Sequence, residues 1–135
     1  MTIRTFAVRS DFKSHTGVCI TMGFGCFYAK STGQKINTIS SCQAELVALA
    51  KGLQQSIHSA YFLAGQGYNI PRIVVNHDSQ STIKLISNGE SNSELARHIQ
   101  ISYSWVKDIM DRGLITIEYC PTEFMIADFF TKLLQ

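Results

Sequence analysis

Three acidic residues of the chain are each flanked by apolar side chains. Glu45 stands in QAELVAL, Asp78 follows the run IVVNH, and Asp128 lies in IADFF. A carboxylate near core-forming positions costs free energy unless it is hydrogen-bonded, paired or bound to a cation. Hard divalent ions such as Mg²⁺ prefer carboxylate oxygens, so three acids brought together from separate elements would suit Mg²⁺, or Mn²⁺ in its place, better than zinc.

A purely structural explanation is also available for each of these acids. Glu45 would complement the dipole of a helix, Asp78 would cap the helix that follows it, and Asp128 would be a surface acid. Three acids dispersed in the sequence do not decide between a metal site and these structural roles. The choice between these two explanations therefore depends on the strands and helices that carry the three acids.

The first half of the chain predicts a β-hairpin followed by a long helix. The runs GVCITM and CFYAKST have strand composition and flank the turn GFG. Ser40, with Gln43 three residues later, is typical of a capping box, and apolar residues then recur at helical spacing from about Cys42 to Ala64. Glu45 would lie in the first turns of this helix.

The second half predicts alternating strands and helices. IVVNH is typical of a buried strand with Asp78 at its carboxyl end, and LITIEY predicts another strand. SQSTIKLISNG predicts a short helix, 93–112 a longer one, and MIADFFTKLL a closing amphipathic helix that carries Asp128. Tyr103 and Trp105 fall on the apolar side of the longer helix and are predicted core residues. This order indicates an α/β fold with a mixed sheet covered by helices, in which ligands gather at strand carboxyl ends.

The composition of the chain limits the classes of protein to which it can belong. The 135 residues, 45% of them apolar, predict a single globular domain over residues 1–135. The formal net charge of +2 permits a nucleic-acid partner without requiring one. No apolar run reaches the ~20 residues of a membrane span, and the N-terminus lacks the apolar core of a signal peptide. We therefore expect an intracellular protein, cytoplasmic or nuclear, that is not secreted and has no membrane partner.

The four cysteines show no metal-binding spacing. Cys19, Cys26, Cys42 and Cys120 are scattered in apolar or helix-starting contexts without a CxxC pair. Buried, reduced thiols are the expectation, in preference to a zinc site or a disulfide framework.

Four longer segments, taken together, carry a family resemblance. STGQKINTISSCQAELVAL, VVNHDSQSTIKL, ARHIQISYSWVKDIMDRG and IEYCPTEFMIADFFTK resemble, in this order, the ribonuclease H domain of copia-class (LTR) retrotransposon polyproteins. The similarity extends from about Phe6 to Leu134. It implies a ribonuclease H-like fold, a mixed five-stranded sheet with helices on both faces. It also implies an endonuclease that cuts the RNA strand of RNA–DNA hybrids with four carboxylates and two Mg²⁺ ions.

The resemblance assigns roles to residues of this chain. Glu45, Asp78 and Asp128 match the second, third and fourth catalytic, metal-binding acids. His98 matches a histidine at the rim of the active site that helps protonation or product release, although a histidine packed on the flank of a helix is the alternative. Contacts to an RNA–DNA hybrid or another nucleic acid would come from Lys30, Ser31, Lys35, Asn37, Ser79 and Gln80, the alternative being a solvated turn.

The N-terminus departs from the family. The first acid of the family stands in a run like VDAS, and counting back from Phe6 puts its position at Ile3, which cannot ligate a metal. Asp11 lies in the following loop and is expected to be a turn former rather than a substitute. Only Met1 and Thr2 precede Ile3, so the usual first strand is missing and two rows of buried backbone groups would lack partners. We expect TIRTFAV to be drawn into the sheet; the alternative is a strand donated by a second copy or by an upstream polyprotein segment.

Three functional hypotheses follow. The first is a retrotransposon-type ribonuclease H domain whose catalysis is weak or absent because the first acid is missing. The second is a domesticated, non-catalytic module that binds nucleic acid or protein on the same fold. The third is a fragment that becomes an intact enzyme only when a preceding polyprotein segment supplies the strand and its aspartate.

Overall fold

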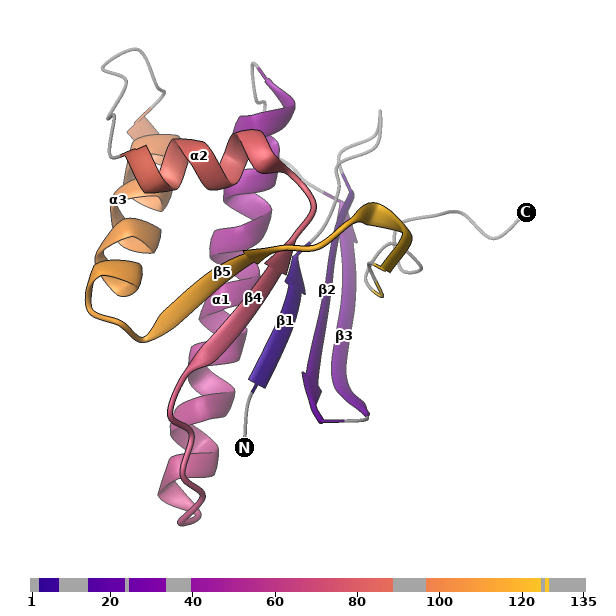
Figure 1. Cartoon of the computed structure of the whole chain (residues 1–135), viewed down its shortest axis with the longest axis vertical. Helices are drawn as coiled ribbons and strands as arrows, with labels where there is room; N and C mark the ends of the chain where they lie inside the picture. Colours follow the sequence, from indigo (N-terminus) through magenta and orange to yellow (C-terminus); the bar gives the residue numbers. More distant parts are fainter. Residues whose placement is uncertain are drawn as a thin grey trace.

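The computed structural model describes residues 3–7, 15–23, 25–33, 40–88, 97–124 and 126, with only the backbone described at 3–7, 15 and 16. Strands and helices alternate along it much as the sequence predicts (Figure 1). The elements are β1 (Ile3–Ala7), β2 (His15–Met22), β3 (Cys26–Gly33), α1 (Ser41–Gly65), β4 (Ile73–His77), α2 (Gln80–Asn88), α3 (Arg97–Asp111), β5 (Ile115–Tyr119) and the 3-10 turn η1 (Thr122–Phe124).

The strands form one mixed sheet in the order β3-β2-β1-β4-β5. β1 pairs antiparallel with β2, and β2 with β3, whereas β1 pairs parallel with β4, and β4 with β5. The predicted mixed five-stranded sheet is therefore confirmed, with its first three strands antiparallel.

Strand β1 occupies the centre of this sheet. Its residues Ile3–Ala7 lie between β2 and β4 and pair with both (Figure 1). A central strand is where unpaired backbone groups would cost most, because they are removed from water on both sides. The expectation that TIRTFAV is drawn into the sheet is confirmed for Ile3–Ala7, while Thr2 and Val8 lie outside the described residues. The chain itself supplies this strand, which removes the reason for proposing that one is donated in trans.

The register of β1 decides where Ile3 lies. Ile3 pairs with Ile73 at the start of β4, and Ala7 pairs with His77 at its end. Asp78 comes directly after His77. The position that sequence comparison equates with the family's first acid thus lies at the opposite end of β1 from Asp78.

The three described helices pack together on one face of the sheet. In the view of Figure 1, α1 lies behind the sheet and contacts β1, β2 and β4, while α2 and α3 pack against α1 and β5. Burying one such aliphatic side chain contributes roughly 1.5–3 kcal/mol. The buried residues of this core include Val18, Ile20, Leu46, Leu49, Leu53, Val75, Ile86, Ile99, Val106 and Ile115.

The aromatic residues of α3 lie where the sequence places them. Tyr103 is buried in the core, and Trp105 packs against it while partly buried. The prediction that both are core residues is therefore confirmed for Tyr103 and holds in part for Trp105. The predicted starts and ends of the helices agree with α1 and α2 within a residue or two. The predicted closing helix with Asp128, and residues 93–96 of the longer helix, lie outside the described residues.

None of the described helices is long and apolar enough to cross a membrane.

The burial of the cysteines is only partly as predicted. All four are free thiols; Cys19 is buried, and Cys42 and Cys120 are partly buried. Cys26 is exposed, so the prediction of burial is wrong for this residue. The reason is its place at the first position of β3, a strand at the edge of the sheet directly after the GFG turn.

Replacing Thr5 by proline tests the central position of β1. Proline removes a backbone donor from a strand that is paired on both sides, so we expect a loss of about 3 kcal/mol or more in the free energy of unfolding, measured by urea denaturation. Thr5→Val keeps the donor and the β-branched shape and should stay within about 1 kcal/mol of the parent chain. Equal stability of the two variants would show that residues 3–7 do not form a central strand.

Candidate active site

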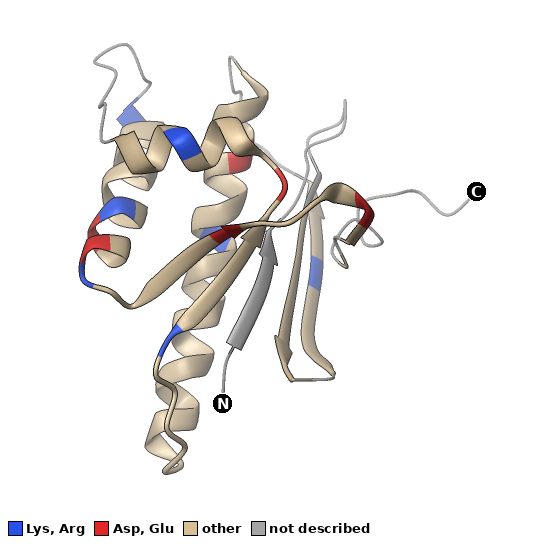
Figure 2. Cartoon of the chain, viewed as in Figure 1, with Lys and Arg blue, Asp and Glu red and all other residues tan. Residues whose placement is uncertain are grey.

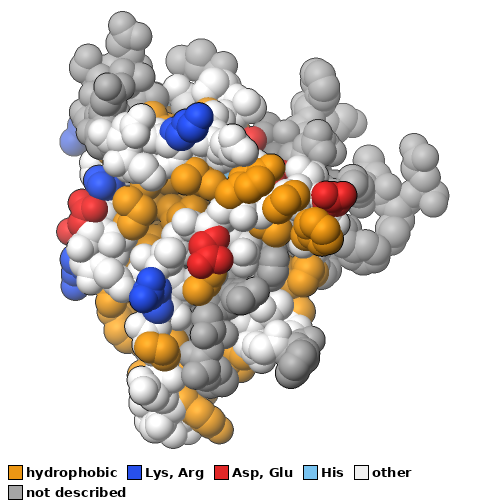
Figure 3. All heavy atoms as spheres, viewed as in Figure 1, with side chains coloured by type: hydrophobic (Ala, Val, Ile, Leu, Met, Phe, Trp, Pro, Cys, Tyr) orange, Lys and Arg blue, Asp and Glu red, His pale blue; other side chains and the backbone are white. Residues whose placement is uncertain are grey.

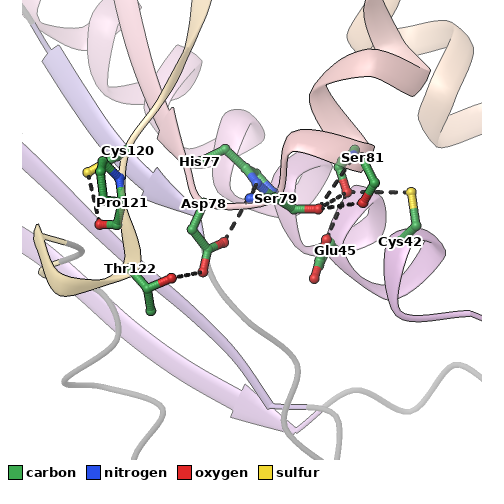
Figure 4. Close-up of polar contacts among 10 residues, drawn as sticks. Cys42, Glu45, His77, Asp78, Ser79, Ser81, Cys120, Pro121 and Thr122 are labelled. Atoms are coloured by element: carbon green, nitrogen blue, oxygen red, sulfur yellow. Dashed lines mark hydrogen bonds and ion pairs between the residues drawn. The ribbon is translucent and has the colours of Figure 1, made fainter.

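Glu45 and Asp78 are brought to the same edge of the sheet from two elements. Glu45 projects from α1, and Asp78 follows the carboxyl end of β4 (Figure 4). Both carboxylates lie near enough to the buried His77 to act on it electrostatically. Two acids that are distant in sequence thus share one neighbourhood, as the metal-site hypothesis requires.

Asp78 does not cap the helix that follows it. The Ser79 hydroxyl accepts a hydrogen bond from the Thr82 backbone N–H at 3.3 Å, and the Ser79 carbonyl accepts one from the Ile83 N–H at 3.2 Å. Ser79 is therefore the N-cap of α2. The Asp78 carboxylate instead accepts a long hydrogen bond of 3.4 Å from the Thr122 hydroxyl of η1. The structural explanation given for Asp78 is wrong, and its carboxylate is left available for another role.

The dipole explanation also fails for Glu45. Helix α1 is capped by Ser40, whose hydroxyl accepts from the Gln43 N–H at 3.3 Å, and its first turn contains no acidic residue. The helix dipole acts mainly on charges within that first turn. Glu45 lies beyond it and is instead held by the Thr82 hydroxyl, which donates to Oε2 at 2.8 Å. Sequence reasoning missed Thr82, which only the packing of α2 against α1 brings to Glu45.

His77 is the second residue that sequence reasoning missed. It is 0% exposed, and its Nδ1 accepts a hydrogen bond from the Ser79 N–H at 3.0 Å. Burial lowers the pKa of His77, an effect that the negative charges of Glu45 and Asp78 oppose. The neutral ring then carries its proton on Nε2, which has no hydrogen-bond partner among the described residues. The sequence does contain a signal for this residue, because His77 stands directly before an acid at the end of a predicted buried strand.

The segment after β5 closes over Asp78. The Cys120 backbone N–H donates to the His77 carbonyl at 2.9 Å, which ties the end of β5 to the end of β4. Burial, and then the negative charge of Asp78, raise the pKa of the Cys120 thiol. Apolar side chains gather along β5 and η1 beside this point, and Tyr119, Phe124 and Ile126 among them are exposed (Figure 3).

The other predicted site residues are more dispersed. Gln80 is the exposed first residue of α2, and Lys30 and Ser31 are exposed on β3. His98 is exposed at the start of α3, so it is not packed on a helix flank, and no described contact links it to Glu45 or Asp78. Lys35, Asn37 and Asp128, as well as Asp11, lie outside the described residues.

A groove with two lysines lies between β3 and α1. Its volume is about 390 Å³, and Lys30 of β3 and Lys51 of α1 both line it. Elsewhere in the described part of the chain, lysines and arginines are spread over several elements rather than gathered on one face (Figure 2). The remaining lining residues are Val18, Tyr28, Thr32, Gly52, Gln54 and Gln55.

Comparison with known proteins gives a relative in sequence. No protein-family profile matches the chain. It is 30% identical over 121 residues, 90% of its length, to part of the retrovirus-related Pol polyprotein from transposon TNT 1-94 of Nicotiana tabacum. The chain spans only 9% of the length of that polyprotein.

Solved structures agree with the fold. The chain resembles the N-terminal RNase H domain of Rv2228c from Mycobacterium tuberculosis with a TM-score of 0.69 and 13% identity, covering 96% of this chain and 89% of that one. RNase H1 from Halobacterium salinarum gives 0.65 and 16%, covering 96% and 94%. LC11-RNase H1, solved in complex with an RNA/DNA hybrid, gives 0.66 and 16%, covering 96% and 91%. The chain therefore shares the fold of these RNase H domains and has a sequence relative within a retrotransposon Pol polyprotein, and the two findings together support an RNase H-type domain of such a polyprotein.

The family resemblance of the sequence implies divalent metal ions, and the described carboxylates fit such ions only in part. Glu45 and Asp78 provide the hard oxygen atoms that Mg²⁺ prefers. The described residues contain no group of three or more His, Cys, Asp or Glu side chains that could hold a metal ion. The two described carboxylates therefore fit the metal in chemical type, while Asp128 would have to complete the set.

Paired substitutions at positions 78 and 79 test which residue caps α2. We expect Ser79→Ala to lower the free energy of unfolding by about 1 kcal/mol, because it removes the N-cap hydroxyl. Asp78→Asn should change it by less than about 0.5 kcal/mol, because the contacts of this carboxylate among the described residues are long, 3.4 Å to the Thr122 hydroxyl and 3.8 Å to His77 Nδ1. Urea denaturation of both variants measures the difference, and the reverse ranking would show that Asp78 is the cap.

Proposed function

We propose that this chain is a ribonuclease H-type domain that binds nucleic acid, with RNA–DNA hybrid as the expected ligand, and that cleaves the RNA strand weakly or not at all. The observation that carries the proposal is the composition and register of β1. The central strand IRTFA contains no Asp or Glu, and Ile3 pairs with Ile73 rather than lying near Asp78. The described strands thus fill the sheet, while the described strand β1 brings no acid to the end where Asp78 lies.

The acids that remain argue for descent from a metal-dependent nuclease. Neither Glu45 nor Asp78 is used for capping or dipole compensation, and Thr82 holds Glu45 in a fixed orientation. Maintaining two carboxylates around a buried histidine is costly for stability alone. Their retention supports a role in holding a cation.

The carboxylates of Glu45, Asp78 and Asp128 would hold Mg²⁺, or Mn²⁺ in its place. Held there, such an ion would supply activation of a water molecule and stabilisation of negative charge on the phosphate and the leaving oxygen. The residues of the chain would serve this by orientation: Thr82 aims Glu45, and the bond from the Ser79 N–H to His77 fixes the turn that carries Asp78. His98 would act at the rim, where an exposed imidazole can exchange a proton with solvent.

Contacts to nucleic acid would come mainly from donors around the β3–α1 groove. Lys30 and Lys51 face a common hollow, and lysines bind backbone phosphates without sequence preference. Ser31, Lys35 and Asn37 would extend this contact. Beside Asp78, exposed Gln80 is better placed than Ser79 to reach a 2′-hydroxyl, because the Ser79 oxygen already caps α2.

A non-catalytic interaction module is the second candidate, favoured by the same missing acid. Domestication of a copia-class element would preserve the fold and the nucleic-acid or protein contacts while cleavage is lost. With either function, we also propose that residues 1–135 form a single domain and that the protein acts in the cytoplasm or the nucleus. The activities and partners of a complete Pol polyprotein, a homodimer included, remain proposals as well.

A cleavage assay separates these possibilities. The purified chain is incubated with a labelled RNA–DNA hybrid in Mg²⁺ or Mn²⁺, and products are resolved on a denaturing gel. We expect no cleavage above that of Asp78→Asn, which controls for a contaminating nuclease. Cleavage that this substitution abolishes would refute the proposed loss of activity and show that another acid completes the site.

Ile3→Asp gives a sharper test in the same assay. Alignment alone suggests that restoring an acid at position 3 would restore cleavage. The register predicts that it will not, because position 3 pairs with Ile73 at the far end of β4 from Asp78. Rescue of cleavage by Ile3→Asp would show that β1 can shift along the sheet.

Binding can be tested independently of cleavage. We expect Lys30→Ala and Lys51→Ala each to weaken hybrid binding roughly threefold to tenfold and to reduce the slope of log K against log salt by about 1. Lys107→Ala is the matched control, because Lys107 is paired with Asp111 on α3 at 2.9 Å. Fluorescence anisotropy with a labelled hybrid measures all three. Equal effects of the three substitutions would exclude the groove as the binding surface.

A further inference from the structure

Two cysteines lie in contact across the β2–β3 hairpin. The Sγ atoms of Cys19 and Cys26 are 3.0 Å apart, and the Cys19 thiol donates to the Cys26 sulfur. The Cys26 thiol in turn donates to the Tyr28 carbonyl at 3.2 Å. Neither cysteine takes part in the site around Glu45 and Asp78, so the pair requires a separate explanation.

An irregularity in the hairpin brings the two sulfurs together. Ile20 pairs with Tyr28, but Thr21 pairs with Cys26, so Phe27 is an extra residue in β3. Cys19 and Thr21 are on one face of β2, and the extra residue places Cys26 on that same face. Because Val18 and Ile20 pack into the core with α1, this face is the one turned away from α1.

The two thiols differ sharply in their surroundings. Cys26 is exposed and can be reached by a small oxidant from solvent. Cys19 is 0% exposed, and burial, with a further contribution from its contact with Cys26, raises its pKa to about 12. Cys19 is therefore protonated at neutral pH and shielded from direct attack, and its thiol donates to the sulfur of Cys26.

We propose that Cys19 and Cys26 form an oxidation site that hydrogen peroxide converts into an intramolecular disulfide. The Cys26 sulfur attacks one peroxide oxygen, the O–O bond breaks, and Cys26 sulfenic acid and one water are formed. The Cys19 sulfur then attacks the Cys26 sulfur and the S–O bond breaks. The Cys19 proton leaves with the hydroxyl as a second water. One peroxide is reduced to two waters, and two thiols are oxidised to one disulfide.

The geometry favours this second step over further oxidation of Cys26. A disulfide bond is about 2.05 Å long, so the sulfurs need to approach by only about 1 Å. The Cys19 thiol already points its hydrogen toward the Cys26 sulfur. The product would tie edge strand β3, which carries Lys30 and Ser31, to β2.

The test is peroxide oxidation of the purified full chain, followed by alkylation under denaturing conditions and intact-mass analysis. Before alkylation, we expect the oxidised chain to be about 2 Da lighter than the reduced chain. After alkylation, it should carry two fewer alkyl groups and yield a peptide in which Cys19 and Cys26 are linked. Dithiothreitol should reverse all three changes. Closing the hairpin should also raise the melting temperature by about 3 °C or more. A product in which Cys26 is oxidised to sulfenic or sulfinic acid while Cys19 is still alkylated would overturn the proposal.

Matched variants assign the disulfide to this pair. Cys26→Ser should abolish the mass loss and the stabilisation, and its exposed position makes it tolerant of substitution. Cys120→Ser, which alters a cysteine outside the pair, should form the disulfide at the parent rate. Persistence of the mass loss in Cys26→Ser, or linkage of Cys26 to another chain in the parent protein, would equally contradict an intramolecular Cys19–Cys26 disulfide.

Discussion

The sheet of this protein depends on filling the position between β2 and β4. Each residue there must offer backbone hydrogen bonds to both sides, since neither neighbour can turn its unpaired groups toward water. The segment Ile3–Ala7 meets that requirement, pairing antiparallel on one side and parallel on the other. Helix α1 then packs across β1, β2 and β4 together, so the core and the placement of Glu45 both follow from this strand.

Completing the sheet and completing a metal site are separate requirements, and strand β1 meets the first without contributing an acid to the second. Backbone pairing is indifferent to side-chain identity, so IRTFA can replace a strand that carries an acid. The remaining site is kept in shape by groups other than its carboxylates: Ser79 caps α2, Thr82 anchors Glu45, and His77 braces the turn. The shape of this region therefore does not depend on an acid in β1.

The sequence correctly predicts those features of the fold that depend on residues close together in the chain. Ser40 with Gln43 marks the start of α1, GFG marks the hairpin, and IVVNH predicts β4. It does not predict the register of β1, because TIRTFAV has no residue that ties it to one place along β4. It also cannot choose between Asp78 and Ser79 as the cap of α2, since both residue types are good caps. The exposure of Cys26 and the contact of Thr82 with Glu45 depend on packing between distant segments.

Strand β3 is an edge strand of the sheet: within the described part of the chain it pairs with β2 alone. An open margin is a template on which another chain can add a strand, which is how many β-proteins begin to aggregate. Two features described above discourage such growth: the extra residue Phe27 disturbs the regular spacing of the strand, and the Lys30 ammonium group would have to be desolvated on approach of a neighbour. The strand that carries Lys30, for which we propose a contact to nucleic acid, would thereby also discourage self-association of the protein.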